Sequence, residues 1–392
     1  MIENGPARSV SDMAAEMIDL GVRRVHVLAW RDFADDEAGG SEDHANEFMT
    51  RWQDAGLSVL HRTSLAPGKP ETEVRNGYDV VRRGGRYGVF PRTMVSELTR
   101  RMGPYDALVE IWNGVPWMSP VWCRKPRILI LHHVHGPMWN QMFPAPVAAM
   151  GRFLETRLAP PFYRRTPTVT TSADTHEELL HLGWRPELVT TGPVGVDPFF
   201  CPGGDKTSHP SVLAVGRQAP VKRFEMLLEQ VARTRVRVPD LTLTLVGNGP
   251  ENERLRAWVR DHDADWVTFA GKVSRDELRE HYRRSWVIAS ASLAEGWGLV
   301  LTEAAGCGTP AVVSDISGHR CSVVNGVTGL LAPVESMGDR IAEVLTDEAL
   351  RRRLSVAAEA RARTLTWEAL AAGVLEPLWR QVVSRATGAS PS

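Results

Sequence analysis

The sequence predicts an α/β protein that consists of two doubly wound domains. Its 392 residues are enough for two domains of ordinary size, each with its own core. Short apolar runs that end in Gly-containing loops alternate with helical patterns, as expected for parallel strands joined by helices. A Pro/Gly-rich run over residues 198–210 interrupts this alternation near the middle of the chain. We therefore expect one domain over residues 1–197 and a second over residues 198–365.

Composition and charge exclude several classes of protein. The 46 basic and 47 acidic residues leave a net charge of −1, so the chain has no overall positive electrostatic field that would favour binding to nucleic acid. The four cysteines are scattered and show no metal-ligand spacing, which suits a reducing compartment. The N-terminus lacks the pattern of a signal peptide, and no apolar stretch approaches the roughly 18 residues of a membrane span. We expect a soluble, cytoplasmic protein that contains small buried cysteines.

The first domain opens with an apolar run over residues 22–30, which we interpret as a buried strand. An acidic loop follows and ends in Gly39-Gly40-Ser41-Glu42, before a helical pattern over residues 42–55. Gly40 lets the backbone approach a ligand closely, and Ser41 is a candidate N-cap. Without further information, an ordinary capped loop explains the same residues.

Further apolar runs of the first domain are interpreted as strands over residues 56–62, 78–86, 107–112, 127–131 and 169–172. A helical pattern covers residues 152–165. Arg82, Arg83 and Arg86, with Arg92 nearby, form the one basic run in this half of the chain. It could meet an anionic acceptor or the surface of a membrane. We favour the simpler interpretation, in which charge protects an edge strand from pairing with another chain.

Three histidines, His132, His133 and His135, follow the strand expected over residues 127–131. Ligands of open α/β sheets bind beyond the carboxyl ends of the strands, so these imidazoles are candidate site residues. Zinc is a competing interpretation, but imidazoles one and two positions apart on an extended chain point in different directions. No companion Cys or carboxylate pattern accompanies them. We therefore expect no metal.

In the second domain, strands are expected over residues 211–216, 241–246, 267–270, 286–290, 311–314 and 330–333. Arg217 and Lys222 lie in the loop after the first of these. Two cations at the carboxyl end of a strand suit a diphosphate, although a solvated basic loop would look the same. Helical patterns cover residues 336–365.

The most informative stretch covers residues 290–310. Glu295-Gly296-Trp297-Gly298 leads into an apolar segment that begins at Leu299 and contains Glu303. A glycine-rich turn before a helix aims unpaired N–H groups at an anion such as a diphosphate. Carboxylates at positions 295 and 303 suit the hydroxyls of a sugar and a ribose. The alternative is a glycine-rich connection to a core helix with solvated glutamates.

These residues carry a resemblance to a known family. The stretch from Glu295 to Pro310 is similar to the signature of glycosyltransferase family 4, retaining enzymes of the GT-B fold, in which two glutamates are separated by seven residues. The similarity continues through Gly318 and through residues 325–329. It implies two Rossmann-like domains that face a cleft. It also implies a UDP-, GDP- or ADP-linked sugar donor and an acceptor that ranges from lipids to small metabolites.

The resemblance assigns roles to individual positions. It implies that Glu295 orients the sugar hydroxyls, that Glu303 binds the ribose and that His132 contacts the transferred sugar, with His133 and His135 as alternatives. Backbone near Gly247 and Val273 is implied to lie beside the nucleobase. The residues implied to face the donor diphosphate are Arg217, Lys222, Gly40, Gly296, Trp297, Gly298 and Leu299. The chain departs from the family at Val194, where Asn is usual, and at Arg223, where Gly is usual.

The predicted reaction is retaining transfer of a hexosyl group from a nucleotide-diphosphate sugar to an acceptor hydroxyl. No Asp-x-Asp motif lies in a suitable loop, so we assign the diphosphate charge to cations and N–H groups and expect neither metal nor cofactor. The alternative is a nucleotide-sugar-binding regulatory protein without turnover. The sequence does not resemble a phosphorylase, because no motif identifies a lysine that would carry pyridoxal phosphate. A dinucleotide-dependent oxidoreductase is also disfavoured, because the first turn between strand and helix lacks the Gly-x-Gly-x-x-Gly pattern. The sequence leaves the donor, the acceptor and the oligomeric state open.

The last part of the chain is predicted to return to the first domain. Residues 366–383 form an amphipathic pattern that Thr366 caps and Pro377 bends. Trp367 matches a position common at the crossing between domains in the family. The tail over residues 384–392 is rich in Ala, Gly, Ser and Pro, and we expect it to be disordered.

Overall fold

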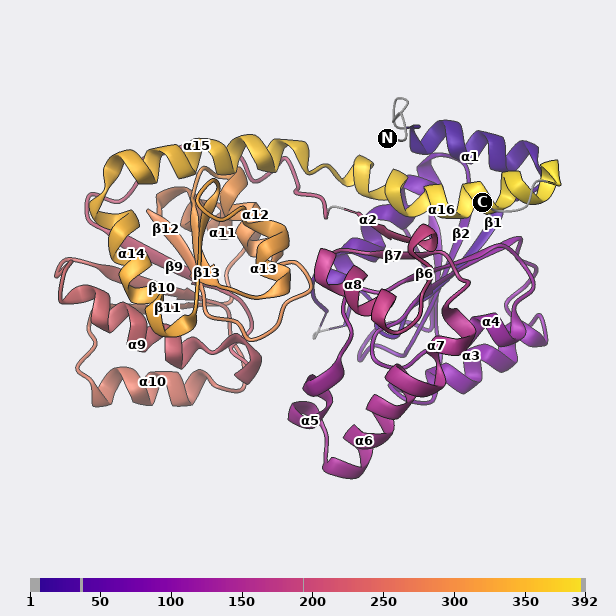
Figure 1. The fold of residues 1–392 in the computed structure, drawn as a ribbon, viewed down its shortest axis with the longest axis horizontal. Helices are drawn as coiled ribbons and strands as arrows, with labels where there is room; N and C mark the ends of the chain where they lie inside the picture. The colour runs from indigo at the N-terminus through magenta and orange to yellow at the C-terminus, as the bar shows by residue number, and fades with distance from the viewer. Residues whose placement is uncertain (1–7, 36–37, 193, 389–392) are drawn as a thin grey trace. The chain divides into compact units, whose positions relative to one another are not determined.

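The structure is a computed structural model that describes residues 8–35, 38–192 and 194–388 (Figure 1). The chain divides into two compact units. Unit 1 consists of residues 1–195 and 367–392, and unit 2 consists of residues 196–366. The sequence predicts the change of domain after Asp197, and the structure has it after Gly195. The predicted α/β class with parallel sheets is confirmed in both units.

The described part of unit 1 contains an eight-stranded sheet in the order β3-β4-β2-β1-β5-β6-β7-β8. Neighbouring strands are parallel except for the β3–β4 pair. The interior strand β5 has all five residues buried, and four of them are apolar. The exception is Glu110, whose carboxylate accepts from the backbone N–H groups of Trp117 and Ser119. The strands are β1 (Arg24–Leu28), β2 (Ser58–Thr63), β3 (Thr72–Arg75), β4 (Tyr78–Arg82), β5 (Ala107–Ile111), β6 (Arg127–Ile130), β7 (Thr168–Thr170) and β8 (Val189–Thr191).

Helices cover this sheet and tie the end of the chain to its beginning. They are α1 (Val10–Asp19), α2 (Gly40–Asp54), α3 (Val89–Leu98), α4 (Ser119–Trp122), α5 (Trp139–Met142), α6 (Ala145–Phe153), α7 (Pro160–Tyr163), α8 (Ala173–His181) and α16 (Trp367–Thr387), with short helices η1 (Gly136–Met138), η2 (Leu154–Leu158) and η3 (Pro186–Leu188). Helix α16 packs on α1 and α2 (Figure 1). The indole of Trp52 donates to the carbonyl of Ala371 at 3.0 Å. Gly195 lies so close to Trp367 that a Cβ would clash with the indole, which explains a glycine at this crossing.

Unit 2 contains, within its described residues, a six-stranded parallel sheet in the order β11-β10-β9-β12-β13-β14. Apolar clusters fill both of its faces. Its strands are β9 (Ser211–Val215), β10 (Thr242–Val246), β11 (Val267–Gly271), β12 (Val287–Ser290), β13 (Ala311–Ser314) and β14 (Gly329–Ala332). Its helices are η4 (Pro220–Lys222), α9 (Phe224–Arg235), α10 (Asn252–Asp261), α11 (Arg275–Arg284), α12 (Leu299–Gly306), α13 (Ser317–Ser322), η5 (Val334–Ser336), α14 (Met337–Thr346) and α15 (Glu348–Thr364).

Both sheets have a switch point, where the order of the strands reverses direction. In unit 2 it lies between β9 and β12, which pair in parallel with Ile288 opposite Leu213. In unit 1 it lies between β1 and β5. Ligands of open α/β sheets bind beyond the carboxyl ends of the strands at this point. The two switch points therefore mark where a site is expected in each unit.

The predicted edge strand with its protective arginines is wrong. Strand β4 lies inside the sheet, because the hairpin turn Asn76-Gly77 adds β3 as an antiparallel edge. Both turn residues have positive φ, 47° and 85°, as a two-residue hairpin requires. Arg82 is fully buried and donates to Asp32 and Glu73 at 2.7 Å each. The first arginine of the basic run thus holds the loop after β1 to the sheet.

Several other boundaries differ from expectation. The helix predicted over residues 152–165 is divided between α6, η2 and α7, where Pro160 starts the last of these. Residues 384–387 belong to α16, so they are not a disordered tail, and residues 389–392 lie outside the described residues. Cys123 and Cys307 are buried as expected, but Cys201 is exposed. Within the described ranges, no helix is both long and apolar enough to cross a membrane.

Candidate functional site

The switch point of unit 2 brings together two residues of the predicted site. Lys222 ends η4, the turn after β9, and Glu295 lies in the loop after β12. Their side chains form an ion pair through Lys222 Nζ and Glu295 Oε1. The side chains are 25% and 15% exposed, so the pair is mostly shielded but open to a ligand. Residues 73 positions apart therefore form one charged group at the expected place.

The Glu295 carboxylate is held in its ionised form. Burial opposes ionisation, but the Lys222 ammonium and a hydrogen bond from Ser292 Oγ at 2.8 Å keep the pKa of Glu295 below its ordinary value. Gly318 packs on the backbone of Glu295 so closely that a Cβ would clash with its carbonyl oxygen. The carboxylate is therefore fixed in position and accepts hydrogen bonds at neutral pH.

His319 is a neighbour of this pair that the sequence analysis missed. It lies on α13, beyond the carboxyl end of β13, and is fully buried. Its Nδ1 lies 2.8 Å from the carbonyl of Ser314, so Nδ1 carries a proton and donates. Its Nε2 has no hydrogen-bond partner among the described residues. Burial lowers the pKa of His319, so a neutral imidazole stands beside Glu295. Its place after a strand of the sheet was the signal that could have found it.

The loop after β12 enters helix α12 as a ligand-binding turn would. Gly298, the N-cap of α12, has φ 90° and ψ 60°, a conformation that favours glycine. Leu299 is the first helical residue, so the first N–H groups of α12 lie beside Gly296 and Gly298. Trp297 is 8% exposed, and its Nε1 has no partner in the described part of the chain.

Glu303 lies further along α12 and is held from the neighbouring helix α11. The hydroxyl of the buried Tyr282 donates to Glu303 Oε2 at 2.7 Å. Tyr282 in turn packs on Phe200 with ring centroids 5.6 Å apart. The second predicted carboxylate is therefore also positioned by its surroundings.

The loops after β9 and β10 are tied together by Gln218, which the sequence analysis also missed. Its amide Nε2 donates to the carbonyl of Gly247 at 3.0 Å, and its Oε1 accepts from Asn252 at 2.6 Å. Gly247 has φ 113° and lies against Gly216, where a Cβ would clash. Close packing between two loops thus gives Gly247 a structural reason to be glycine.

The remaining predicted donor residues are distributed around these loops. Arg217 is exposed and follows β9, and Val273 is partly buried against an apolar cluster after β11. Arg223, where the family usually has glycine, is the left-handed N-cap of α9 with φ 51°. This conformation explains why glycine is usual there.

In unit 1, Gly40 opens helix α2 beyond the carboxyl end of β1. The predicted cap is wrong: Gly39 is the N-cap, and Glu42 closes it by accepting from the Gly39 N–H at 2.9 Å. Ser41 donates to the same carboxylate at 2.9 Å. Glu42 is 7% exposed, and burial raises its pKa. Gly40 itself is exposed at the start of the helix.

His132 is buried beyond the carboxyl end of β6. Both ring nitrogens lack hydrogen bonds to any described residue. The ring stands edge-on to His44 of α2, with centroids 4.9 Å apart. Burial, then the neighbouring His44 and His133, hold the pKa of His132 well below its ordinary value. A pair of neutral imidazoles, one from each of two elements, therefore lies here.

His135 belongs to a loop that Glu155 of η2 holds in place. The Glu155 carboxylate accepts from the backbone of His135 at 2.8 Å, from Gly136 at 2.9 Å and from Trp139 Nε1 at 3.1 Å. Burial opposes ionisation, but the His135 side chain, with its Nδ1 3.5 Å from Glu155 Oε1, and then the backbone N–H groups of His135 and Gly136 keep the pKa of Glu155 below its ordinary value. His133 stacks near His135, with ring centroids 4.5 Å apart. His132 therefore packs on His44 of α2, whereas His135 lies beside Glu155 and Trp139.

An apolar pocket of about 160 Å³ lies at the switch point of unit 1. It is lined from the carboxyl ends of three strands, with Trp30 after β1, Asn113 after β5 and His135 after β6. Aromatic and aliphatic side chains complete the wall, namely Tyr87, Phe90, Val115, Trp139, Phe143, Val147, Met150 and Leu154. The indole of Trp139 rests on Gly151 of α6. No signal in the sequence identified this pocket.

Among the residues that the structure describes, no three His, Cys, Asp or Glu side chains gather as a metal site would require.

Comparisons with known proteins identify relatives of the chain. Residues 202–361 match the model of the family described as glycosyl transferases group 1. The D-inositol 3-phosphate glycosyltransferase of Kribbella flavida is 34% identical over 221 residues, which are 50% of this chain and 52% of that protein. The chain therefore spans about half the length of the curated relatives of this kind that it matches.

Two further matches extend over most of the chain. The GDP-mannose-dependent alpha-(1-6)-phosphatidylinositol monomannoside mannosyltransferase of Mycolicibacterium smegmatis is 28% identical over 317 residues, 73% of this chain and 80% of that protein. The solved structure of a sucrose-phosphate synthase from Thermosynechococcus elongatus superposes with a TM-score of 0.74 and 21% identity. It covers 93% of this chain and 100% of that chain, which shows the fold.

Proposed function

The chain belongs to the group 1 glycosyltransferases, glycosyltransferase family 4 with the GT-B fold, and from this premise we propose that it transfers a hexosyl group from a nucleotide-diphosphate sugar to an acceptor hydroxyl with retention. The observation that carries this proposal is the Lys222–Glu295 pair at the switch point of unit 2. It combines a cation for the diphosphate and a carboxylate for the sugar in one fixed group. A metal ion is not required in this proposal.

Charge on the leaving diphosphate is the main chemical demand of the reaction. Lys222, the exposed Arg217 and the first N–H groups of α12 are positive groups around the same loops. Fixed donors of this kind stabilise developing charge without reorganising during the reaction. The Lys222 ammonium has three donors, so it can keep Glu295 as a partner while it contacts a phosphate oxygen.

The two glutamates hold the rest of the donor. Glu295 is ionised at neutral pH and accepts from the sugar hydroxyls. Glu303, held by Tyr282, accepts from the hydroxyls of the ribose. These roles need carboxylates in fixed positions, and the hydrogen bonds around both provide that.

In the proposed reaction the bond between the sugar C1 and the phosphate oxygen breaks, and its electron pair goes to the diphosphate. The acceptor oxygen bonds to C1 from the same face, and its proton passes to an oxygen of the leaving diphosphate. His132 is neutral in its buried place, so it accepts or donates one hydrogen bond to the sugar without adding charge.

The pocket at the switch point of unit 1 limits the kind of acceptor. Its wall is aromatic and aliphatic, with His135 and Asn113 as polar groups. We therefore propose an acceptor that presents an apolar portion near its reacting hydroxyl. The name of the Mycolicibacterium smegmatis relative, a phosphatidylinositol monomannoside mannosyltransferase, agrees with an acceptor that contains an apolar part.

The test begins with donor binding and then measures turnover. Thermal stabilisation by UDP, GDP and ADP is measured with and without EDTA on the wild type, on Lys222→Ala and on Lys69→Ala, which removes an exposed lysine of unit 1. We expect one nucleotide to stabilise the wild type and Lys69→Ala regardless of EDTA, and Lys222→Ala to weaken its binding about tenfold or more.

Release of that nucleotide from its sugar donors, with alkyl glycosides and free sugars as acceptors, then distinguishes an enzyme from a binding protein. Nucleotide binding without any turnover supports the regulatory alternative. Stabilisation by none of the nucleotides contradicts the donor site.

A further inference from the structure

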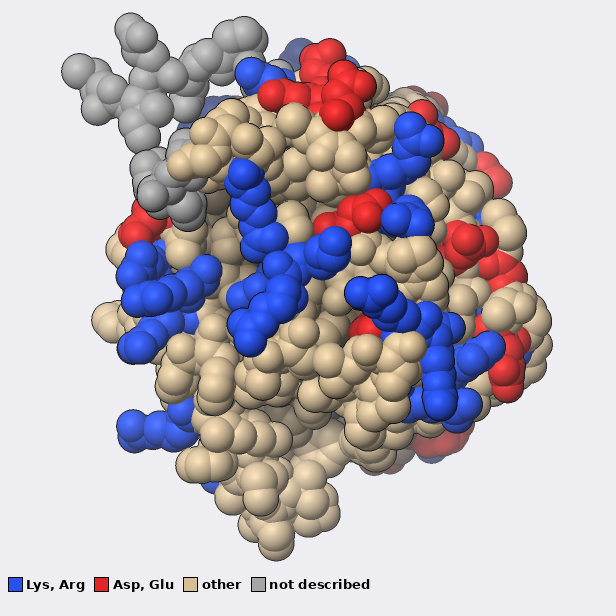
Figure 2. All heavy atoms as spheres, turned by 90° about the vertical axis from the view of Figure 1, so that its right-hand side faces the viewer, with Lys and Arg blue, Asp and Glu red and all other residues tan. Residues whose placement is uncertain are grey.

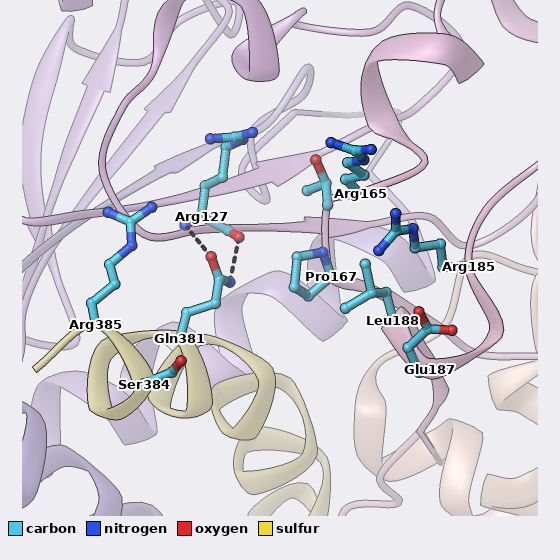
Figure 3. A pocket seen from close by; sticks show the side chains of 10 residues that line it. Arg127, Arg165, Pro167, Arg185, Glu187, Leu188, Gln381, Ser384 and Arg385 are labelled. Atoms are coloured by element: carbon cyan, nitrogen blue, oxygen red, sulfur yellow. Dashed lines mark hydrogen bonds between the residues drawn. The ribbon is translucent and has the colours of Figure 1, made fainter. Parts of the chain in front are cut away.

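A second pocket in unit 1 is basic and lies at the opposite end of its strands from the carboxyl ends. It has a volume of about 510 Å³ and lies at the amino ends of β6, β7 and β8. Four arginines line it from different elements, Arg127, Arg165, Arg185 and Arg385. Figure 3 shows Arg127 on its strand, Arg165 and Arg185 on the loops that follow α7 and α8, and Arg385 on α16. Figure 2 shows several groups of Lys and Arg side chains on one face of the molecule.

The arginines of this pocket are not neutralised by acidic side chains in the part of the chain that the structure describes. None of the four forms an ion pair with a described residue, and Glu187 is the single acidic side chain of the lining. Arg127 Nη1 donates to the carbonyl of Cys123 at 3.1 Å, and Arg385 Nη1 donates to the carbonyl of Arg124 at 3.1 Å. Four like charges around one cavity repel each other unless an anion enters.

Two buried polar atoms of the lining also lack partners. Thr166 is 1% exposed, and its hydroxyl forms no hydrogen bond within the described residues. Arg127 Nε is buried and likewise has no partner there. A buried hydroxyl and a buried N–H that stay unsatisfied are costly, so a ligand with several acceptor oxygens would compensate both.

Hydrogen bonds between α16 and β6 hold the scaffold of the pocket together. Gln381 of α16 accepts from the Arg127 N–H at 3.3 Å and donates to the Arg127 carbonyl at 2.6 Å (Figure 3). These bonds attach α16 to the first residue of β6. Arg165 and Arg185 are exposed, so their guanidinium groups are open to a ligand from solvent. Guanidinium forks match the oxygens of phosphate in pairs.

We propose that this pocket binds the phosphate group of a phosphomonoester, at a place separate from the donor and acceptor groups described above. Its volume lies within the roughly 300–1,000 Å³ typical of small-molecule sites, so it admits more than a bare ion. The phosphate group belongs either to a soluble metabolite or to the headgroup of an anionic lipid. Both sources offer the same dianionic oxygens to the four arginines.

The test measures binding to a double variant that removes the two exposed arginines, Arg165→Ala/Arg185→Ala. Arg23→Ala/Arg101→Ala is the matched control, because both of its arginines are exposed, belong to unit 1 and do not line the pocket. Inorganic phosphate and glycerol 3-phosphate are titrated calorimetrically. Phosphatidylcholine vesicles with and without phosphatidic acid are tested by flotation. Every titration is repeated on Lys222→Ala, which separates this pocket from the proposed diphosphate site.

We expect phosphate or glycerol 3-phosphate to bind the wild type, the control and Lys222→Ala alike, and to bind Arg165→Ala/Arg185→Ala at least about tenfold more weakly. Hydrogen exchange should slow over residues 164–170 and 184–191 when the ligand is present. Binding to phosphatidic acid vesicles alone, with the same dependence on the variants, assigns the phosphate to a lipid headgroup. Absence of binding to all probes, or equal binding by the two double variants, overturns the proposal.

Discussion

The carboxyl-end sites of the two units are built in different ways. In unit 2, the charged groups already satisfy each other, since Lys222 pairs with Glu295 and Tyr282 donates to Glu303. In unit 1, His132 is buried without a hydrogen-bond partner for either ring nitrogen among the described residues, and His135 of the same loop lines an apolar pocket. One site is organised by electrostatics before a ligand arrives, and the other by apolar packing that leaves hydrogen bonds for a ligand to complete.

The largest expected difference between the units is their response to acid. Burial lowers the pKa of His44 and of His61 to about 4, and that of His132 also lies well below its ordinary value. The unfolded chain therefore binds protons below about pH 6.5 that the folded unit 1 does not bind. The contribution of these neutral histidines to the free energy of unfolding is fully present above about pH 6.5. It falls as the pH decreases toward 4, by about 3 kcal/mol for each of His44 and His61.

Hydrogen exchange at pH 7.5, 6 and 5 measures the stability of each unit separately. We expect unit 1 to lose stability more steeply than unit 2, where burial lowers the pKa of His319 and His281. His44→Asn should reduce the slope in unit 1, and His181→Asn, at an exposed histidine of the same unit, should leave it unchanged. Equal slopes in wild type and His44→Asn would show that His44 is not buried in its neutral form.

The next effect concerns the preorganised charge of unit 2. Glu295→Gln keeps the shape of the side chain but removes the charge that pairs with Lys222 and accepts sugar hydroxyls. We expect kcat/KM to fall about 10²–10³-fold, as for other fixed groups that act on developing charge. Steady-state kinetics of donor turnover measure this. Glu335→Gln, at an exposed glutamate of the same unit, is the control. A loss of less than about threefold would remove Glu295 from the site.

The apolar packing of unit 1 is tested by Gly151→Ala. A Cβ at this position would stand 2.5 Å from the Trp139 ring, so the indole that lines the pocket must move. We expect a loss of about 1–3 kcal/mol in stability and a higher KM for the acceptor, with donor binding unchanged. Gly373→Ala is the control, because this glycine of α16 has nothing within 4 Å and the alanine should stabilise its helix. An unchanged acceptor KM in Gly151→Ala would separate the pocket from the acceptor.

The same contrast explains what could be predicted from the sequence. The donor side of unit 2 could be predicted from the sequence, because Glu295, Gly298 and Glu303 lie within one short stretch and the strands on either side are strongly apolar. Its missed members, Gln218 and His319, each follow a strand of the same sheet. Their contacts depend on how neighbouring loops pack, which spacing along the chain does not contain.

The site in unit 1 depends more on tertiary structure. His44 of α2 meets His132, which follows β6, only in the folded chain, and Glu155 reaches the loop at His135 from a separate helix. The hairpin that buries Arg82 does not depend on tertiary structure in this way. Its turn, Asn76-Gly77, is a strong local signal in the sequence from which the hairpin could have been predicted. The arginine pocket likewise unites residues from four separate segments.

The smallest effect distinguishes two buried tyrosine–glutamate pairs, one in each unit. Tyr282 donates to Glu303 in unit 2, and Tyr163 donates to the fully buried Glu110 in unit 1. Replacing either tyrosine by phenylalanine removes one hydrogen bond to a carboxylate and keeps the ring, so each change should cost about 1–2 kcal/mol of stability. Only Tyr282→Phe frees a glutamate assigned to the donor, and we expect it to raise the donor KM about fivefold with little change in kcat. Tyr163→Phe should destabilise unit 1 and leave the donor KM unchanged. If the two variants give the same donor KM, Glu303 is held for the packing of α11 on α12 and not for the ribose.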